Sequence, residues 1–319
     1  MEGHHGITKS KETKEYGEVI ITHPKLKQYH LYFEKPEEWL FTNNETNSEK
    51  LFGQPNKTPY VKDLFHDAVI NSDFELTRAV DEGTKFAPMY SEIVKGESEI
   101  SIKLRLSKKA HKSNPLKNSF DSTFEKRIEE ANSFYEEFQK SKNEDLANIQ
   151  RQAFAGMMWS KQYFNIDMET WMKGDPGQPS PSAERLNGRN KEWMTLNNED
   201  IISMPDKWEY PWYAAWDLAF HCVPIAMIDA EFAKEQMILM TREWYMAPNG
   251  QIPAYEWAFS DVNPPVQAWA TYEIYKIDKE RNGNSDIQFL KRMLNKLALN
   301  FTWWVNRKDR SGNLSLIHI

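Results

Sequence analysis

The hydrophobic period changes once along this chain, and that change restricts the folds it can adopt. Up to about residue 110 the apolar residues come in short runs, and Glu99–Leu106 alternates strictly between polar and apolar positions. Such alternation is typical of a half-buried strand, and several such strands predict part of a β-sandwich. From Ser122 onward apolar residues recur every three or four positions, which predicts helices. We therefore expect a mainly α chain with an N-terminal all-β part.

The helical region is expected to hold about six helices and one long loop segment. The segment 165–212 is rich in Pro, Gly, Asn and Trp, and long loops inside compact domains are usually functional. The predicted helices cover about 122–138, 143–164, 213–228, 231–246, 264–278 and 285–307. The predicted domains are a β-sandwich part at 1–110, a linker at 111–121 and a helical domain at 122–319.

Composition narrows the choice of partners and compartment. Forty basic and 47 acidic residues give a net charge of -7, which disfavours nucleic acid and anionic membranes as partners. Cys222 is the only cysteine, so an internal disulfide is impossible, a cysteine-based metal cage is unexpected and a cytoplasmic location is predicted. No signal-like or 18-residue apolar segment appears, so no membrane span is expected. Four glycosylation sequons are interpreted as chance occurrences, at Asn44, Asn56, Asn300 and Asn313.

Tryptophans and carboxylates are interleaved over a short part of the helical region. Eleven of the 12 tryptophans follow residue 150. Aromatic rings stack on the apolar faces of sugars, and carboxylates and amides bind sugar hydroxyls, so this mixture indicates a saccharide cleft. Core packing is the simpler explanation for any single Trp. The cluster comprises Asp206, Trp208, Glu209, Trp212, Trp216, Asp217, Trp244, Glu256, Trp257, Asp261, Asn263 and Trp269.

Two carboxylates in this cluster admit both a functional and a structural interpretation. Asp217 lies in the first turns of an apolar helix. It could bind a ligand there, or its negative charge could simply be stabilised by the helix dipole. Glu256 stands between aromatic residues in a loop, and it could bind a sugar or pair with Arg242 or Lys234. The two could also form the acid and base of a glycosidase. His221 is interpreted as a core residue, and neither a metal nor another cofactor is expected.

Three long strings resemble bacterial proteins of glycoside hydrolase family 63, relatives of the processing α-glucosidases and of mannosylglycerate hydrolase. They are Ile202–His221, Asn249–Pro265 and Asn300–Asp309. Upstream, Leu40–Asn47 and Pro59–His66 resemble the end of that family's N-terminal β-sandwich. The resemblance implies a six-hairpin (α/α)6 barrel, hydrolysis of an α-glycosidic bond with inversion, and no metal.

The resemblance also implies which residues contact the substrate, an oligosaccharide or a small glycoside. Trp216-Asp217 matches a Trp-Asp step beside the scissile bond that holds sugar hydroxyls. The predicted substrate-binding residues are Tyr213, Trp216, Asp217, Glu256, Trp257 and Asn263. The catalytic acid and base are expected beyond this sequence, because the family's Gly-Leu-Asp-Asn-like segment does not follow Asp309 here.

Two functional hypotheses follow. The first is an inverting α-glucosidase-like hydrolase of glucosides or mannosides, of which this chain is a fragment that is inactive and aggregation-prone alone. The second is a carbohydrate-binding or structural helical module without turnover. The oligomeric state and the exact sugar are left open by the sequence.

Overall fold

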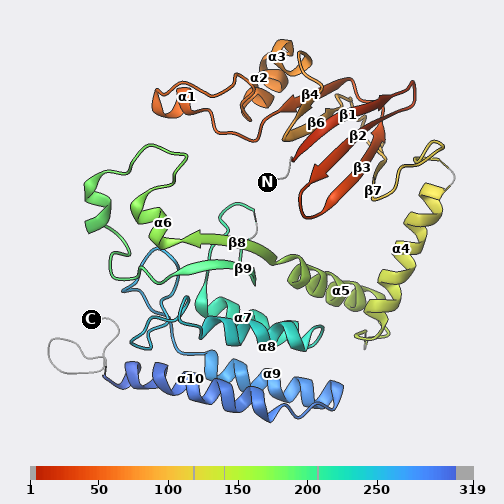
Figure 1. Cartoon of the computed structure of the whole chain (residues 1–319). Coiled ribbons are helices and arrows are strands. Elements are labelled where there is room, and N and C mark those ends of the chain that lie inside the picture. Colours follow the sequence, from red (N-terminus) through yellow and green to blue (C-terminus); the bar gives the residue numbers. More distant parts are fainter. Residues whose placement is uncertain (1–4, 118, 140, 207, 307–319) are drawn as a thin grey trace. The chain divides into compact units, whose positions relative to one another are not determined.

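The computed structural model describes residues 5–117, 119–139, 141–206 and 208–306. The chain divides into two compact units, Met1–Ser133 and Phe134–Ile319. Each unit has its own hydrophobic core, and Figure 1 shows strands dominating the first and helices the second. This confirms the expected order of an N-terminal β-rich region followed by helices.

An antiparallel five-stranded sheet organises the first unit, with strand order β5-β1-β2-β3-β7. Its strands are β1 (Gly6–Glu12), β2 (Tyr16–His23), β3 (Lys27–Glu34), β5 (Glu82–Gly83) and β7 (Leu104–Ser107). The alternating segment 99–106 is a strand only from Leu104. Residues before it do not pair as a strand, because alternation alone does not supply a partner edge.

A second pair of strands shares the core of this unit. The antiparallel strands are β4 (Glu38–Thr42) and β6 (Lys85–Met89). Val19 and Phe33 of the large sheet pack with Trp39 and Phe41 of the small one. Gly17 permits this contact, since a Cβ atom there would lie 2.5 Å from the Trp39 ring. Three short helices lie between the strands, α1 (Ser48–Phe52), α2 (Leu64–Asn71) and α3 (Glu75–Arg78).

The second unit is mainly helical. Helix α4 crosses the division between the units, and the others follow it in the sequence. Their bounds are α4 (Ser119–Glu136), α5 (Glu144–Trp159), α6 (Met168–Lys173), α7 (Ala215–Ala226), α8 (Ala230–Met240), α9 (Gln267–Asn282) and α10 (Ile287–Asn306), with a 3-10 turn at Ala183–Asn187. Helices α4, α5 and α7 to α10 fall close to the predicted ones, whereas α6 and the 3-10 turn lie within the segment 165–212 that was predicted to be loop.

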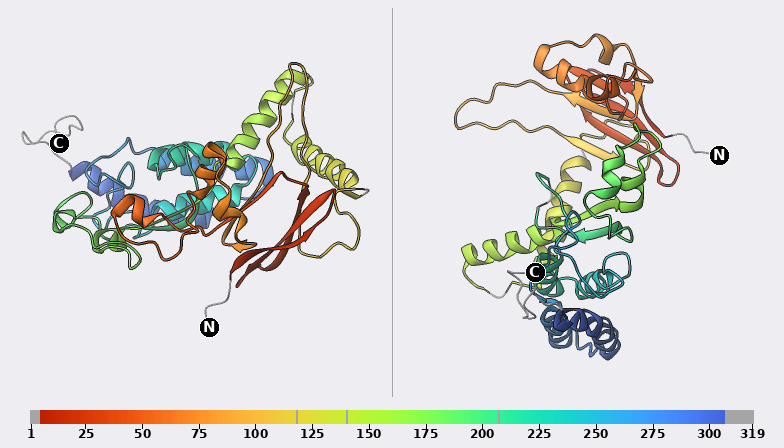
Figure 2. Two further views of the ribbon diagram at one scale, coloured as in Figure 1. Left: turned by 90° about the horizontal axis from the view of Figure 1, so that it is seen from above. Right: turned by 90° about the vertical axis from the view of Figure 1, so that its left-hand side faces the viewer.

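Helix α7 is central to this unit. It packs against α5, α8, α9 and the hairpin strand β9, and six of its residues are buried. Helix α10 packs on α8 and α9. Figure 2 shows α7 and α8 lying between the hairpin and the α9–α10 pair. The start of α7 is therefore held by neighbours from several parts of the sequence, which makes it a rigid support for functional side chains.

A β-hairpin-like pair corrects the sequence prediction for residues 161–212. Strand β8 (Lys161–Asp167) pairs antiparallel with β9 (Asn197–Ser203) over seven positions. The sequence predicts a helix up to residue 164 and a loop beyond it. The pairing partners lie far apart in the sequence, and such non-local contacts leave little trace in local periodicity.

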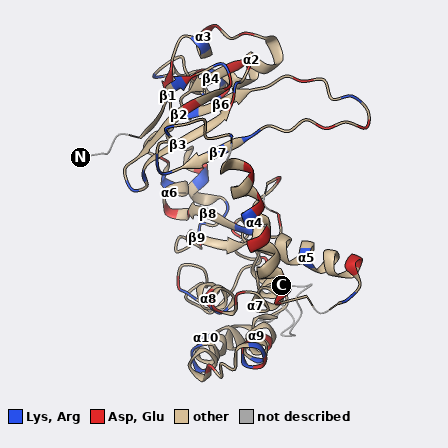
Figure 3. Cartoon of the chain, turned by 90° about the vertical axis from the view of Figure 1, so that its right-hand side faces the viewer, with Lys and Arg blue, Asp and Glu red and all other residues tan. Residues whose placement is uncertain are grey.

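A buried ion cluster in this unit joins helices α8 and α9 to the residue that precedes α10. The Lys234 side chain, 4% exposed, contacts Asp278 at 3.2 Å and Asp286 at 3.1 Å, and also pairs with Glu231. Burial lowers the pKa of Lys234, but the three carboxylates outweigh it and raise that pKa. The outer helices also carry mixed surface charge, and Figure 3 shows acidic and basic residues together on α9 and α10.

The loop after α8 is tied to α10 by a close backbone approach. Gly250 has φ +90°, and a Cβ atom there would lie 2.6 Å from the Leu299 carbonyl oxygen. Asn300, 4% exposed, donates a hydrogen bond from Nδ2 to the Gly250 carbonyl oxygen at 2.8 Å. Only glycine satisfies both the backbone angle and the contact.

None of the described helices is both long and apolar enough to cross a membrane.

Candidate functional site

Two of the strings singled out in the sequence lie side by side in the second unit. The backbone N–H of Tyr213 donates to Glu256 Oε2 at 3.1 Å. Ala215 N–H donates to the Ala254 carbonyl at 3.0 Å, and Ala214 forms a β-bridge with Tyr255. The structure thus brings the beginning of α7 and the loop 254–257 into one site, across about forty residues of sequence.

Glu256 is a buried carboxyl group whose neighbours are backbone amides. It is 2% exposed, and burial raises its pKa to about 7, although hydrogen bonds from its own N–H and from Tyr213 N–H act in the opposite direction. The suggested partners Arg242 and Lys234 are not its partners. Arg242 lies over the Trp244 ring at 5.4 Å, and Lys234 belongs to the buried ion cluster.

Tyr213 is fully buried beneath this contact. Its ring meets Tyr245 edge-on at 5.4 Å, and its hydroxyl has no hydrogen-bond partner among the described residues. Burial, followed by the nearby Glu256 carboxylate, raises the Tyr213 pKa. The Tyr213 side chain therefore packs in the interior of the unit, where a ligand cannot reach it.

Trp216 and Asp217 occupy the first turn of α7 and are both half-buried. Trp216 meets Phe220 edge-on at 6.0 Å. Asp217 Oδ2 is buried and has no partner within the described part of the chain. A buried carboxylate oxygen without a partner costs free energy, which is typical of a functional residue. The charge of Asp217 in the first turn of α7 is also stabilised by the helix dipole, so both interpretations fit this position.

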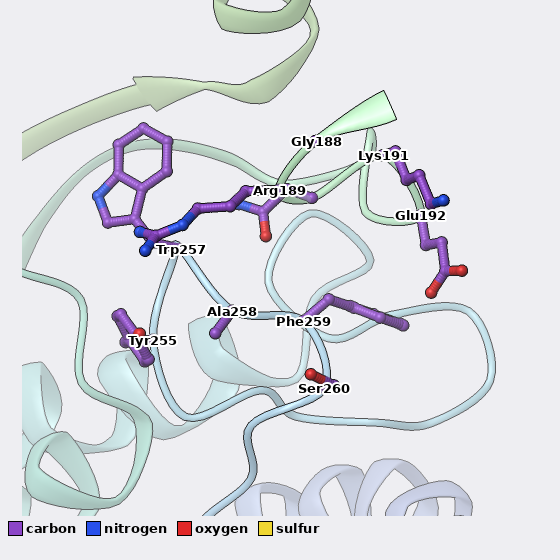
Figure 4. A pocket seen from close by; sticks show the side chains of 10 residues that line it. Gly188, Arg189, Lys191, Glu192, Tyr255, Trp257, Ala258, Phe259 and Ser260 are labelled. Carbon is purple, nitrogen blue, oxygen red and sulfur yellow. The ribbon is translucent and has the colours of Figure 1, made fainter. Parts of the chain in front are cut away.

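A cavity of about 300 Å³ lies beside Glu256, between the loops 188–192 and 255–260. Figure 4 shows the side chains of both loops around it, with Arg189 pointing toward Trp257. The wall combines aromatic, charged and amide groups. It consists of Gly188, Arg189, Asn190, Lys191, Glu192, Tyr255, Trp257, Ala258, Phe259 and Ser260.

Asn190 connects this cavity wall to the Glu256 loop. The residue is 6% exposed, its Nδ2 donates to the Glu256 carbonyl oxygen, and its Oδ1 has no described partner. This oxygen is buried, and a buried acceptor without a partner costs free energy. Trp257 is held from behind by Trp171, whose ring lies edge-on at 5.1 Å.

The six predicted substrate-binding residues divide into four groups. Tyr213 and Glu256 contact each other, Trp257 lines the cavity, and Trp216 and Asp217 follow on α7. Asn263 is half-buried and does not line the cavity. Sequence reasoning missed Arg189 and Asn190. The only signal for them was the unusual length and composition of the segment that contains them.

Metal binding has no support in the described ranges, where no group of three or more His, Cys, Asp or Glu residues could hold an ion. Cys222 is a buried free thiol whose pKa is raised by burial.

Comparison with known proteins shows which family part of this chain is similar to. Residues 210–318 match the family model described as the mannosylglycerate hydrolase MGH1-like glycoside hydrolase domain. The matched part of the chain is therefore similar to a glycoside hydrolase domain. All six predicted substrate-binding residues fall inside the matched range, whereas Arg189 and Asn190 precede it.

A curated relative extends the similarity upstream. The uncharacterized protein YMR196W of Saccharomyces cerevisiae is 47% identical over 292 residues. The alignment covers 86% of this chain and 26% of the yeast protein, so the chain spans about a quarter of that relative's length.

Proposed function

We propose that this chain forms part of the sugar-binding cleft of an inverting glycoside hydrolase that acts on α-linked glucosides or mannosides. The observation that carries the proposal is the cavity between the loops 188–192 and 255–260, which flanks the Glu256 that accepts the Tyr213 N–H. The family match over residues 210–318 supports it.

The cavity wall has the chemistry of a saccharide site. Tyr255 and Trp257 offer aromatic faces for the apolar side of a sugar ring. Arg189 and Glu192 offer a donor and an acceptor for hydroxyls. A cavity of about 300 Å³ is at the small end of ligand pockets, which suits one or two sugar rings.

Asp217 and Glu256 have different roles in this proposal. Asp217 binds sugar hydroxyls, as the family resemblance implies for its Trp-Asp step. Glu256 positions the beginning of α7, because its carboxylate already accepts the Tyr213 N–H and is almost inaccessible. These contacts favour a supporting role over the alternative in which the two residues are the catalytic acid and base.

The fold proposal follows the same resemblance. We infer that residues 122–319 belong to the first part of an (α/α)6 barrel, and that residues 1–110 belong to a β-sandwich. The antiparallel helices α7 to α10, packed around one core, are consistent with helical hairpins of such a barrel. The catalytic acid and base are then supplied by segments other than those described.

The test is to express the complete open reading frame that encodes this chain and to assay it on a panel of α-glucosides and α-mannosides. We expect release of a sugar whose anomeric configuration is inverted, as followed by NMR. Binding without turnover would favour the carbohydrate-binding module. Neither binding nor turnover across the panel would overturn the proposal.

A further inference from the structure

Asn190 has a backbone conformation that residues other than glycine rarely adopt. Its φ is +60°, in the left-handed region, and the residue is 6% exposed. Asn tolerates this region better than most side chains, but the conformation still costs free energy. A buried residue keeps it only where the surrounding contacts hold it. The role of Asn190 therefore lies in those contacts.

The Asn190 side chain joins the two walls of the cavity. Asn190 belongs to the loop 188–192, and its Nδ2 donates to the carbonyl oxygen of Glu256, which lies within the opposite wall 255–260. A carbonyl oxygen only accepts, so this contact fixes which end of the amide faces Glu256. Nδ2 also lies 3.7 Å from Met168 Sδ. The amide donor is thus committed to the opposite wall.

Both ends of this link are held by buried neighbours. Glu256 is 2% exposed, and its Oε2 accepts the Tyr213 N–H at 3.1 Å. At the other end the Asn190 carbonyl oxygen accepts the Trp193 N–H at 2.8 Å. Trp193 is 1% exposed, and its ring centroid lies 5.8 Å from that of Phe259. The link is therefore anchored in the core, and its length sets the separation of the two walls.

We propose that Asn190 is a positioning residue that holds the loops 188–192 and 255–260 at the separation that a sugar ring requires. The inference rests on the proposed function and adds a residue that acts through the Glu256 carbonyl. With the walls joined before the ligand arrives, binding does not have to order Tyr255 and Trp257. Loss of the Nδ2 donor removes a partner of a buried carbonyl oxygen and releases the two loops from each other.

Two substitutions separate the hydrogen bond of Asn190 from its backbone angle. Asn190→Gly adopts the positive φ without strain but has no donor. Asn190→Asp keeps the shape and tolerates the φ, but its ionised carboxylate cannot donate to Glu256. Asn187→Asp, at the exposed end of the preceding 3-10 turn, is the matched control for the added charge. At pH 8 we expect both Asn190 variants of the full-length protein to bind methyl α-glucoside or methyl α-mannoside about tenfold more weakly, and the control to be unchanged.

The pH dependence of Asn190→Asp gives a readout that a general loss of stability would not produce. The introduced carboxyl group is buried and faces a carbonyl oxygen, and both effects raise its pKa. Its protonated form donates to Glu256 as the amide does. We expect the affinity of this variant, relative to the unaltered protein at the same pH, to recover from pH 8 to pH 5. Asn190→Gly should show no such recovery. The comparison at each pH cancels the titration of Glu192 and Glu256, which both proteins share.

Hydrogen exchange followed by mass spectrometry tests the link without any sugar. The Trp193 N–H is bonded to the Asn190 carbonyl oxygen and the Asp261 N–H to the Ala258 carbonyl oxygen, so each amide reports on one wall. We expect peptides that contain either amide to exchange about tenfold faster in Asn190→Gly, with peptides from α9 unchanged.

The outcomes separate this inference from the proposed function. Unchanged exchange at both walls, or unaltered sugar affinity in both folded Asn190 variants, would overturn the inference while leaving the glycosidase proposal standing. Failure of every sugar to bind the unaltered protein would instead overturn the proposed function and, with it, the role of Asn190 in sugar binding.

Discussion

Glu256 accepts a hydrogen bond from the backbone N–H of Tyr213 at 3.1 Å, and this contact joins a loop to the segment that leads into α7. The carboxyl group is nearly inaccessible, and burial places its pKa at about 7 instead of the ordinary 4.5. Its ionisation therefore falls within the range of ordinary assays. The contact between Glu256 and the Tyr213 N–H is consequently sensitive to pH.

The first prediction concerns stability as a function of pH. Between pH 4.5 and about 7 the folded chain holds a proton on Glu256 that the unfolded chain has released, so stability falls as pH rises through this window. The rise in the Glu256 pKa corresponds to a loss of at most about 3 kcal/mol in the free energy of unfolding. Glu256→Gln keeps an acceptor for Tyr213 and cannot ionise, so its unfolding free energy should lack this decline.

Urea unfolding of both proteins at pH 5 and pH 8 measures the effect. Glu209→Gln is a matched control, because it removes an exposed carboxylate and should retain the decline of the unaltered protein. If the unfolding free energies of the unaltered protein and of Glu256→Gln changed in parallel with pH, the prediction would be contradicted.

The second prediction concerns the cavity wall. Trp257→Ala removes an aromatic face and should weaken binding of a methyl α-glycoside at least about tenfold. Trp208, 85% exposed, does not line the cavity, and Trp208→Ala should bind nearly as well as the unaltered protein. Isothermal titration with circular dichroism as a folding check distinguishes them, and equal losses in both variants would exclude a specific role for Trp257.

The third prediction concerns the buried ion cluster. Lys234→Met leaves Asp278, 2% exposed, without its cation and should destabilise the protein by about 3–5 kcal/mol. Lys276, 40% exposed, pairs with Glu273 at the surface, and Lys276→Met should cost less than about 1 kcal/mol. Denaturant midpoints of the two variants give the comparison. A near-neutral Lys234→Met would mean that water reaches the cluster.

The fourth prediction concerns the approach of Gly250 to α10. Gly250→Ala combines an unfavourable φ with a backbone clash at Leu299, and we expect a loss of about 2–4 kcal/mol. Gly283→Ala has a similar positive φ but open space around the added methyl group, so about 1 kcal/mol is expected. Thermal unfolding ranks the two, and similar losses would show that the φ angle alone sets the cost.

The helices of the second unit could be predicted because their signals are local. Apolar residues repeat every three or four positions in α7 to α10, and Asp229 caps α8 by accepting a hydrogen bond from the Phe232 N–H. The β8–β9 pair could not be predicted in the same way. Its register depends on residues far apart in the sequence, such as Gln162 and Ile202, which are separated by forty positions.

Part of the candidate site could be predicted because its signals, like those of the helices, are local. Residues 213–217 and 254–257 stand out as unusual strings, and the structure joins them. The role of Asn190 and the polar contact of His221 depend on partners distant in sequence, Glu256 for the first and Ser203 for the second. Neither residue type suggests such a contact by itself, since a lone Asn in a loop and a lone His on an apolar helix are common.

The hydrogen bond from Asn300 to Gly250 bears on how this protein should be produced. Asn300-Phe301-Thr302 is a glycosylation acceptor sequence, and the nitrogen that would receive the glycan is the one that donates to Gly250. In a secretory host, transfer can precede folding, and a glycan at this buried position would prevent α10 from docking. Expression in a bacterial cytosol avoids that modification, and a secreted preparation would contain misfolded, heavier chains.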